Sequence, residues 1–334
     1  MLPLAVTLGD PAGIGPEITA KAWAHLRKTG NVFALVGSMS SAIRACADLN
    51  LPAPQSIDDI REAADIFADA LPVLALDGPD SIPGKPDSAA ADLITGSIKT
   101  ATTLTLSGKA AAIVTNPIAK SVLYAAGFSH PGHTEYLGQL TKDVTMDSPR
   151  GPVMMLTAAG LRVALVTIHE PLSKVPKLIT GNLIKSRARI LSHALKTDFG
   201  IANPRIAVCG LNPHAGEDGM IGREDAEIIN PACAQLRAEG VNVTDALPAD
   251  TMFHAEARAG YDGALAMYHD QGLIPVKTLD FHGGVNVTLG LPIVRTSPDH
   301  GTAFDIAGKG IARPDSLIAA LKIARDMSGN RAAI

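Results

Sequence analysis

The sequence predicts an α/β protein whose parallel strands are covered by helices on both faces. Short apolar runs have the character of strands, and amphipathic segments with helical character lie between many of them. The runs are continuously apolar, which is typical of strands that are buried on both faces. The chain has 334 residues, of which 46% are hydrophobic and 19% are charged, so it is long enough to bury a sizeable core.

The predicted elements follow one another along the whole chain. Strands are expected at LAVTL (4–8), FALVG (33–37), LPVLAL (71–76), AAAIVT (110–115), VMMLT (153–157), RVALVT (162–167), RIAVCG (205–210), GALAMY (263–268) and GVNVTLG (284–290). Helices are expected at residues 16–27, 89–107, 177–196 and 224–239. Residues 78–88 are rich in proline and glycine and are expected to form a plain surface connection. The run AMYHDQGLIPVK (266–277) begins and ends like a buried strand, although polar residues lie in its middle.

The charge and the cysteine content exclude several classes of partner. The formal net charge is −4 and no basic stripe is present, so a nucleic-acid partner is not expected. The 3 cysteines are scattered, which argues against a disulfide framework or a cysteine-based zinc site and for a reducing compartment. No apolar run approaches about 18 residues, and no signal peptide is visible. We therefore expect a cytoplasmic protein without a membrane partner.

The segment TLGDPAGIGPEI (7–18) connects the first predicted strand to the first predicted helix. Pro16 suits the first turn of a helix, and Glu17 suits its positive end. The glycines permit a close approach of the backbone to a ligand, so the turn is either structural or a cradle for an anion or a cofactor. The spacing is not G-x-G-x-x-G, so a standard dinucleotide fingerprint is not predicted.

Three of the ten histidines share a position relative to predicted strands. His169, His214 and His269 each lie at or just beyond the C-terminal end of a strand-like run. The C-terminal ends of parallel strands lie along one edge of a sheet, where ligands bind. Three imidazoles that converge there form a site for a divalent metal ion with open positions for a substrate. Taken singly, each histidine is more typical of a packed or surface position, and only the shared position of the three balances that alternative against a metal site.

Other polar residues indicate recognition of an anion. In the motif HPGHTEYL, His133 and Thr134 precede a predicted helix, which Thr134 would cap or whose N-terminus would hold a phosphate. Lys277, Asn286 and Arg295 are spaced along the last predicted strands. A lysine, an amide and an arginine together suit a carboxylate or a phosphate, although they are alternatively three independent surface side chains.

Seven motifs in the same order resemble the 4-hydroxythreonine-4-phosphate dehydrogenase family of pyridoxal phosphate (vitamin B6) biosynthesis. They are GDPAGIGPE, TNPIAK, GHTEYL, LNPHAGEDG, LPADTMF, MYHDQGLIP and GVNVTLGLPIVRTSPDHGTA. The resemblance runs from about residue 4 to residue 325. The string TSPDHGTAFDIAGKGIARP (296–314) also resembles the cofactor loop of the isocitrate and isopropylmalate dehydrogenase superfamily, and the segment GDPAGIGPE (9–17) resembles the N-terminal GDGIGPE loop of that superfamily with two residues inserted.

The resemblance implies a particular architecture. Two α/β/α domains with a cleft between them are expected, of the isocitrate/isopropylmalate dehydrogenase-like type. Residues 1–140 and 292–334 are expected to form the cofactor-side domain, and residues 141–291 the metal- and dimer-side domain. A homodimer is implied, with an active site at the subunit interface that draws on both subunits.

The resemblance also assigns roles to residues, position by position. It makes His169, His214 and His269 the ligands of one divalent ion per subunit. Three neutral histidines favour zinc or cobalt, and magnesium stays an alternative. The implied substrate contacts are His133, Thr134, Lys277, Asn286 and Arg295. The cofactor, NAD or NADP, is expected to contact Gly13, Gly15, His300, Gly301, Thr302 and Asp305.

Two residues are candidates for a catalytic role within this resemblance. Lys277 is expected to stabilise charge or transfer a proton, with anchoring of the substrate as the alternative. Asp250 is a candidate for an acid–base role or for orienting the residues that hold the metal.

The implied reaction depends on a metal ion and on NAD(P). It is the oxidation of 4-phosphohydroxy-L-threonine at C3 to 2-amino-3-oxo-4-phosphooxybutanoate, followed by decarboxylation to 3-amino-2-oxopropyl phosphate. One alternative is a dehydrogenase of 4-phospho-D-threonate or 4-phospho-D-erythronate in sugar-acid catabolism. An alternative of another class is a metal-dependent hydrolase or a protein that binds a phosphate ligand, against which the intact string DHGTAFDIAGKG argues.

Overall fold

The computed structural model describes residues 1–130 and 132–333, and the chain divides into two compact units. Unit 1 consists of Met1–Val144 and Pro292–Ser328, and unit 2 consists of Thr145–Leu291 and Gly329–Ile334. Both units alternate strands and helices, so the predicted α/β class is confirmed. Pro131 of the HPGHTEYL motif lies outside the described residues.

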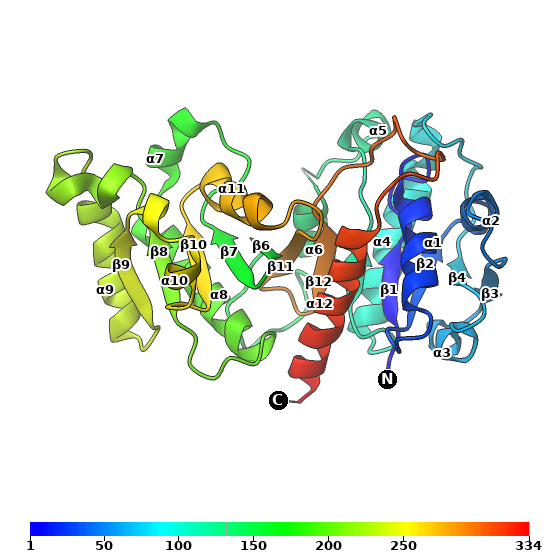
Figure 1. Ribbon diagram of the computed structural model, residues 1–334, viewed down its shortest axis with the longest axis horizontal. Helices are drawn as coiled ribbons and strands as arrows, with labels where there is room; N and C mark the ends of the chain where they lie inside the picture. The colour runs from blue at the N-terminus through cyan, green and yellow to red at the C-terminus, as the bar shows by residue number, and fades with distance from the viewer. Residues whose placement is uncertain (131, 334) are drawn as a thin grey trace. The chain divides into compact units, whose positions relative to one another are not determined.

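The sheet of unit 1 is parallel. Its strands follow the order β3-β4-β2-β1-β5-β12, of which β3, β4, β2, β1 and β12 are labelled in Figure 1. Their bounds are β1 (Leu4–Thr7), β2 (Phe33–Gly37), β3 (Gln55–Ile57), β4 (Pro72–Ala75), β5 (Ile113–Thr115) and β12 (Arg295–Pro298). The central strands are fully buried, as their continuously apolar sequences predicted. Strand β3 was not predicted, because its three residues, QSI, carry no strong apolar signal.

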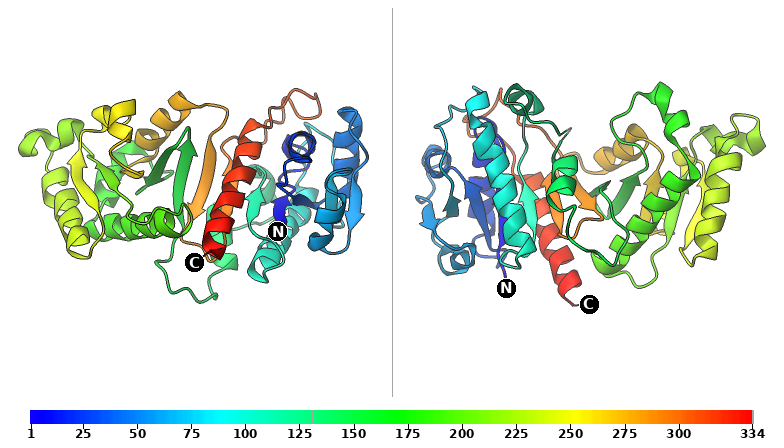
Figure 2. Two further views of the ribbon diagram at one scale, coloured as in Figure 1. Left: turned by 60° about the horizontal axis from the view of Figure 1, so that its bottom comes forward. Right: turned by 180° about the vertical axis from the view of Figure 1, so that it is seen from behind.

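Helices lie on both faces of this sheet. Figure 1 shows α1 and α12 in front of the strands, and the view from behind in Figure 2 shows α4 in front of them. The helices are α1 (Gly15–Leu26), α2 (Met39–Asp48), α3 (Ala63–Ile66), α4 (Ala91–Leu106), α5 (Lys120–Ala125), α6 (His133–Leu140) and α12 (Asp315–Ala332), with short turns η1 (Ile60–Glu62) and η2 (Ser88–Ala90). Pro16 lies in the first turn of α1, as predicted.

The sheet of unit 2 mixes parallel and antiparallel strands. Its order is β11-β6-β7-β10-β8-β9. The bounds are β6 (Val153–Ala158), β7 (Leu161–Leu165), β8 (Ile206–Cys209), β9 (Val243–Leu247), β10 (Gly263–Ala266) and β11 (Val285–Leu289). β7, β10, β8 and β9 are parallel, but β6 is antiparallel to both β7 and β11, so the prediction of purely parallel sheets is wrong here.

The antiparallel pairing has a local cause. Ala159 and Gly160 have φ values of 47° and 81° and join β6 directly to β7. Two consecutive residues with positive φ form the tight turn that a two-residue hairpin requires. The sequence carried this signal in the Ala-Gly pair between two apolar runs, but the two runs were interpreted as separate parallel strands.

The helices of unit 2 are shorter and more interrupted than the sequence indicated. They are α7 (Val175–Leu178), α8 (Gly181–Thr197), α9 (Asn230–Ala238), α10 (Ala255–Arg258) and α11 (His269–Leu279), with turns η3 (Leu172–Lys174), η4 (Pro213–Gly219), η5 (Asp225–Ile229) and η6 (Ala249–Thr251). The single helix expected over 177–196 is two helices, because Thr180 begins a new one by accepting the backbone N–H of Leu183 on its side chain.

The run 266–277 does not end as a strand. β10 ends at Ala266, and α11 begins at His269, so the expected strand position of Lys277 is wrong and this residue lies in the last turn of a helix. Pro275 lies inside α11, which gave the segment its strand-like appearance in the sequence. The buried face of α11, Leu273 and Val276, packs on the core formed with β6, β7 and β10.

The connection at 78–88 is not a plain surface loop. The backbone N–H of Gly84 donates to the carbonyl of Ala12 over 2.8 Å, which ties the connection to the glycine-rich segment at 9–17. A guanidinium N–H of Arg44 donates to the carbonyl of Ser81. The connection is therefore part of the packing of unit 1.

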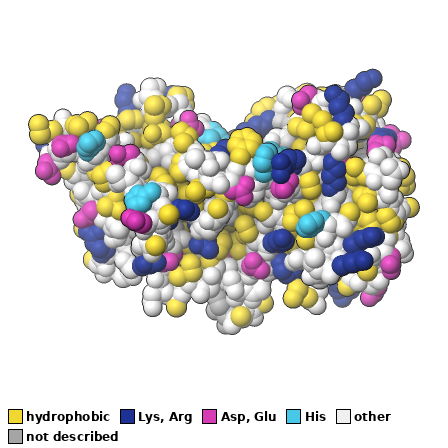
Figure 3. Space-filling model, viewed as in Figure 1, with side chains coloured by type: hydrophobic (Ala, Val, Ile, Leu, Met, Phe, Trp, Pro, Cys, Tyr) yellow, Lys and Arg dark blue, Asp and Glu magenta, His cyan; other side chains and the backbone are white. Residues whose placement is uncertain are grey.

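Charged side chains of both signs are mixed on one face of the molecule. On the face shown in Figure 3, Lys and Arg side chains are interspersed with Asp and Glu rather than gathered in a single patch. Among the described residues 1–130 and 132–333, no helix combines the length and the apolar character needed to cross a membrane.

Gly272 allows α11 to lie directly on the sheet. A Cβ at this position would lie 2.7 Å from Cδ2 of Leu165 and 3.0 Å from Cγ1 of Val163. Substitution Gly272→Ala should lower the free energy of unfolding by about 1–3 kcal/mol, because either the helix or the side chains of Leu165 and Val163 must shift. Urea unfolding measures the change. Gly96→Ala inside α4 is the matched control, because no atom lies within 4 Å of its Cβ position, and it should be neutral or stabilising. Equal effects of the two variants would contradict the close approach.

Candidate active site

The three predicted metal ligands lie along one edge of the unit 2 sheet. His169 follows β7, His214 follows β8, and His269 begins α11 just after β10. β10 pairs in parallel with β7 on one side and with β8 on the other. Because parallel strands end at the same edge of a sheet, the three loops that carry these histidines are neighbours.

The rings of His169 and His269 lie side by side, with 5.5 Å between their centroids. Two imidazoles that bind one tetrahedral ion through nitrogen at about 2.1 Å have centroids about 5 Å apart, so this pair fits a shared divalent ion. Nδ1 of His269 lies 2.8 Å from Oδ1 of Asp270. When Nδ1–H donates to that carboxylate, Nε2 keeps its lone pair for a metal ion.

His214 does not join this pair in a single chain. Its side chain is 68% exposed, and its Nδ1 lies 3.3 Å from Oε2 of Glu217. Within the ranges 1–130 and 132–333, no group of three or more His, Cys, Asp or Glu side chains is close enough to hold a metal ion. One chain therefore brings together two of the three predicted ligands.

A left-handed turn, which no sequence pattern predicted, carries His214. His214, Ala215, Glu217 and Asp218 have φ values between 46° and 54°, and Gly216 between them has a φ of 84°. Non-glycine residues adopt this region at a cost of about 1–2 kcal/mol each, so contacts elsewhere must hold the turn in place.

Asp225 provides such contacts and was not singled out by the sequence. It is fully buried, and its Oδ1 accepts the backbone N–H of Leu211 over 2.7 Å. Its Oδ2 accepts the backbone N–H of Asn212 over 3.1 Å and the side-chain amide of Asn212 over 2.9 Å. These bonds fix the chain immediately before His214 and so fix the direction in which the turn leaves the sheet.

Two predicted substrate contacts lie together in unit 1. Arg295, at the start of β12, is buried and donates to Oγ1 of Thr115 from Nε over 3.2 Å and from Nη2 over 2.7 Å. Burial lowers the pKa of Arg295 to about 10, while the nearby carboxylate of Glu135 acts in the opposite direction. The guanidinium therefore keeps its positive charge at neutral pH.

His133 is the first residue of α6. Burial, together with the charge of Arg295, holds the pKa of His133 well below its ordinary value of 6.5. Its Nε2 is buried and has no hydrogen-bond partner in the part of the chain that the structure describes. A neutral imidazole beside a fixed cation can donate one further hydrogen bond to an anion.

The predicted capping role of Thr134 is wrong. The N-cap of α6 is Gly132, and Thr134 is already inside the first turn. Thr134 nevertheless keeps a place at the N-terminus of α6, beside His133, where backbone N–H groups favour an anion.

The other predicted substrate and catalytic residues belong to unit 2. Nζ of Lys277 lies 5.2 Å from the ring centroid of Phe281. Asn286 lies on β11, and its Oδ1 is buried without a hydrogen-bond partner among the described residues. Asp250 is exposed in η6. Because buried acceptors without partners are uncommon, Asn286 is a strong candidate for contact with a ligand donor.

The two segments expected to hold the cofactor contact each other in unit 1. The backbone N–H of Ile14 donates to the carbonyl of Thr302 over 2.9 Å. A Cβ at Gly13 would lie 2.9 Å from that same oxygen, so a residue without a side chain is needed there. Residues 9–17 and 296–312 are thus held against each other by contacts that the sequence could not show.

Glu17 and Lys21 hold the second of these segments on α1. Glu17 is buried and accepts the backbone N–H groups of Ala312 over 2.8 Å and of Gly310 over 3.3 Å. Lys21 donates to Glu17 and to the carbonyls of Gly310 and Ala312. Glu17, which the sequence placed at a helix N-terminus, therefore also fixes the segment at 296–312.

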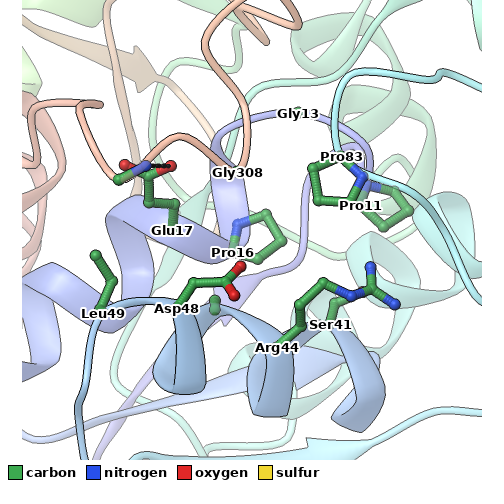
Figure 4. A pocket seen from close by; sticks show the side chains of 12 residues that line it. Pro11, Gly13, Pro16, Glu17, Ser41, Arg44, Asp48, Leu49, Pro83 and Gly308 are labelled. Atoms are coloured by element: carbon green, nitrogen blue, oxygen red, sulfur yellow. Dashed lines mark hydrogen bonds between the residues drawn. The ribbon is translucent and has the colours of Figure 1, made fainter.

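A pocket lies between these segments and α2, and its empty space of about 380 Å³ includes open solvent (Figure 4). Side chains of Arg44 and Asp48 on α2 border it. Of the residues expected to contact the cofactor, Gly13 lines the pocket, whereas His300, Gly301 and Asp305 are exposed on their segment. Gly15 is buried in α1. The pocket does not collect the expected cofactor residues into one site.

Comparisons with known proteins identify the family. The model of the family "Pyridoxal phosphate biosynthetic protein PdxA" matches residues 30–324. A protein of Maricaulis maris called 4-hydroxythreonine-4-phosphate dehydrogenase is 56% identical over 99% of this chain and 98% of its own. A protein of Caulobacter vibrioides with the same name is 54% identical over 98% of each chain.

A solved structure shows the same fold. The 4-hydroxythreonine-4-phosphate dehydrogenase of Klebsiella pneumoniae is 39% identical and superposes with a TM-score of 0.86, over 98% of this chain and 100% of that one. The chain therefore belongs to the family of the pyridoxal phosphate biosynthetic protein PdxA. It is an oxidoreductase, a dehydrogenase, and this activity implies a nicotinamide cofactor and a phosphorylated substrate. The alternative of a hydrolase or a binding protein is not supported.

The lowered pKa of His133 predicts a pH dependence of stability. Below pH 6.5 the unfolded imidazole takes up a proton, whereas the folded one stays neutral until its own lower pKa is reached. The wild type should therefore lose stability relative to His133→Gln as the pH falls below 6.5, by up to about 1.4 kcal/mol per pH unit. Urea unfolding between pH 8 and 5 measures the difference. The control is His25→Gln, at an exposed position of α1. A difference between the wild type and His133→Gln that is constant with pH would contradict the lowered pKa.

Proposed function

We propose that this member of the family oxidises 4-hydroxythreonine 4-phosphate at C3 and releases CO₂ and 3-amino-2-oxopropyl phosphate, with NAD or NADP as the hydride acceptor. The observation that carries the proposal is the His169–His269 pair at the sheet edge, in a chain that is 56% identical to a relative of that name.

The proposed reaction balances in two stages. C3 loses a hydride to the nicotinamide ring and its hydroxyl loses a proton, which gives the β-keto acid 2-amino-3-oxo-4-phosphooxybutanoate. The bond between C1 and C2 then breaks, its electrons stay on C2, and C2 takes up a proton as CO₂ leaves. Transfer of the hydride is the chemistry that the nicotinamide cofactor supplies when bound.

Arg295 and His133 are proposed to hold the phosphate group. The guanidinium of Arg295 is buried and positively charged, and its planar fork suits two phosphate oxygens. His133 has a buried Nε2 without a partner among the described residues, which can donate to a third oxygen. Thr134 and the backbone N–H groups at the start of α6 complete this anion site.

His169, His214 and His269 are proposed to hold one divalent ion per subunit. The donor set of three neutral imidazoles favours zinc or cobalt over magnesium. When bound, such an ion supplies Lewis acidity, which lowers the pKa of a hydroxyl group and stabilises negative charge on oxygen. Asp270 orients His269 for this role through the contact at Nδ1.

The remaining unit 2 residues are proposed to act on the polar groups of the substrate. Lys277 is positioned by α11 to balance carboxylate charge or to move a proton. Asn286 offers its unpartnered Oδ1 to an ammonium or hydroxyl donor. Asp250 is the second candidate for proton transfer. The cofactor is proposed to rest on residues 9–17 and 296–312.

We further propose a homodimer in which His214 of one subunit joins His169 and His269 of the other. Within six residues of each of the three histidines, the chain carries a large apolar side chain that is exposed in the single chain. Leu172 is 66% exposed, Met220 is 86% exposed, and Ile274 is 64% exposed. Exposed apolar residues beside an incomplete site are expected where a second copy of the chain covers them.

A comparison of substrates tests the proposed reaction. NADH or NADPH formation at 340 nm should be seen with 4-hydroxythreonine 4-phosphate, should stop on chelation, and should return when zinc or cobalt is added back. 4-Phospho-D-threonate is the matched control, because it carries a hydroxyl where the substrate carries an amine. Preference for this second compound would place the chain in sugar-acid catabolism and overturn the proposed substrate.

Mixed dimers test the shared metal site. His214→Ala and His269→Ala should each be inactive. After the two are unfolded and refolded together, about one quarter of wild-type activity should return, because half of the dimers are mixed and each of these has one intact site. Mixing His169→Ala with His269→Ala is the control and should restore nothing. No recovery in the first mixture would show that His214 and His269 of a site come from one chain, which would contradict the proposed sharing.

A further inference from the structure

We propose that Gln271 is a positioning residue of the two metal sites of the dimer: it holds the His269 loop of one site and the His214 loop that the same chain contributes to the other site. The inference rests on the proposed function, because it concerns the same site. Gln271 lies two residues after His269, in the first turn of α11, and its side chain is half-buried.

The amide of Gln271 joins the ends of two neighbouring strands. Its Oε1 accepts the backbone N–H of Met267, just beyond β10, over 2.7 Å. Its Nε2 donates to the carbonyl of Gly210, just beyond β8, over 2.7 Å. One side chain therefore bridges the loop that leads to His269 and the loop that leads to His214.

Met267 extends this connection to the third histidine. Its carbonyl accepts the hydroxyl of Thr167 over 2.7 Å and the backbone N–H of Thr167 over 3.2 Å. Thr167 lies two residues before His169. The carbonyl of Met267 thus contacts the His169 loop through Thr167, and the N–H of Met267 contacts Gln271. Gln271 in turn contacts the His214 loop at Gly210.

The side-chain amide of Gln271 satisfies two different partners at once. The N–H of Met267 needs an acceptor, and the carbonyl of Gly210 needs a donor. A carboxylate offers acceptors alone, and an apolar side chain offers neither. Loss of the amide would leave two backbone groups unsatisfied at the point where ordinary strand pairing has ended.

The consequence is specific to metal binding. Residues that orient ligands typically change metal affinity by about 10–100-fold when they are removed. We therefore expect Gln271→Met, which keeps the length of the side chain but loses both hydrogen bonds, to raise the Kd for Co²⁺ by about this factor. Gln271→Glu should keep the bond to Met267 and lose the one to Gly210, so it should also weaken binding.

The experiment is a titration of the full-length, metal-free protein with Co²⁺, followed by the visible absorption band of the bound ion. Gln235→Met is the matched control. Gln235 lies on the exposed face of α9 and accepts a hydrogen bond from Lys185 of α8. The melting temperature of each metal-free variant is measured alongside. A purely structural role would lower the melting temperature and leave both the Kd and the shape of the Co²⁺ band unchanged.

The outcomes separate the inference from the proposed function. If the wild type binds no Co²⁺, the proposed metal site is wrong. If the wild type binds Co²⁺, and Gln271→Met binds it with the same Kd and the same band as Gln235→Met, the role of Gln271 is wrong. If Gln271→Met does not fold, Gln271→Glu gives the same test, and wild-type binding by that variant would equally overturn the inference.

Discussion

The candidate active site depends on the parallel pairing of β7, β10 and β8. Adjacent strands lie about 4.8 Å apart, so β7 and β10, which end together, bring His169 and His269 within reach of one small ligand, while β8 on the other side of β10 carries the His214 loop. Pairing continues beyond the strands: the N–H of Val166 donates to the carbonyl of Ala266 over 2.8 Å. The close approach of α11 at Gly272 then sets the height of His269 above the sheet. Each of these contacts is far from any substrate, yet together they place two imidazoles 5.5 Å apart.

Each unit contains a feature that lowers the stability of the fold and that a ligand can use: a strained turn in unit 2 and a buried charge in unit 1. In unit 2, the left-handed turn at His214–Asp218 is held by the buried carboxylate of Asp225 and presents His214 to solvent. In unit 1, Arg295 is buried with the hydroxyl of Thr115 and keeps its charge, and it helps to keep His133 neutral. Strained backbone and buried polar groups without partners concentrate at functional sites, because a bound ligand supplies the missing interactions.

Much of the fold could be predicted from the sequence, because buried parallel strands are continuously apolar and helix signals such as Pro16 are local. The positions of His169, His214 and His269 after strands also followed from local pattern. The predicted strand position of Lys277 is wrong because Pro275, a residue that is unusual inside a helix, lies in α11. The β6–β7 hairpin was not predicted because its turn is only two residues long. The links made by Gln271, Glu17 and Asp225 join residues distant in sequence, and periodicity carries no information about such contacts.

The most direct test of this account is the amount of Co²⁺ bound by the wild type and by single alanine variants of His169, His214 and His269. The account predicts one ion per chain in the wild type and a large loss of affinity in all three variants, because each imidazole supplies one of three protein ligands. Loss confined to the His169 and His269 variants, with normal binding by the His214 variant, would contradict it. That result would leave the exposed turn at His214 without a role in the metal site.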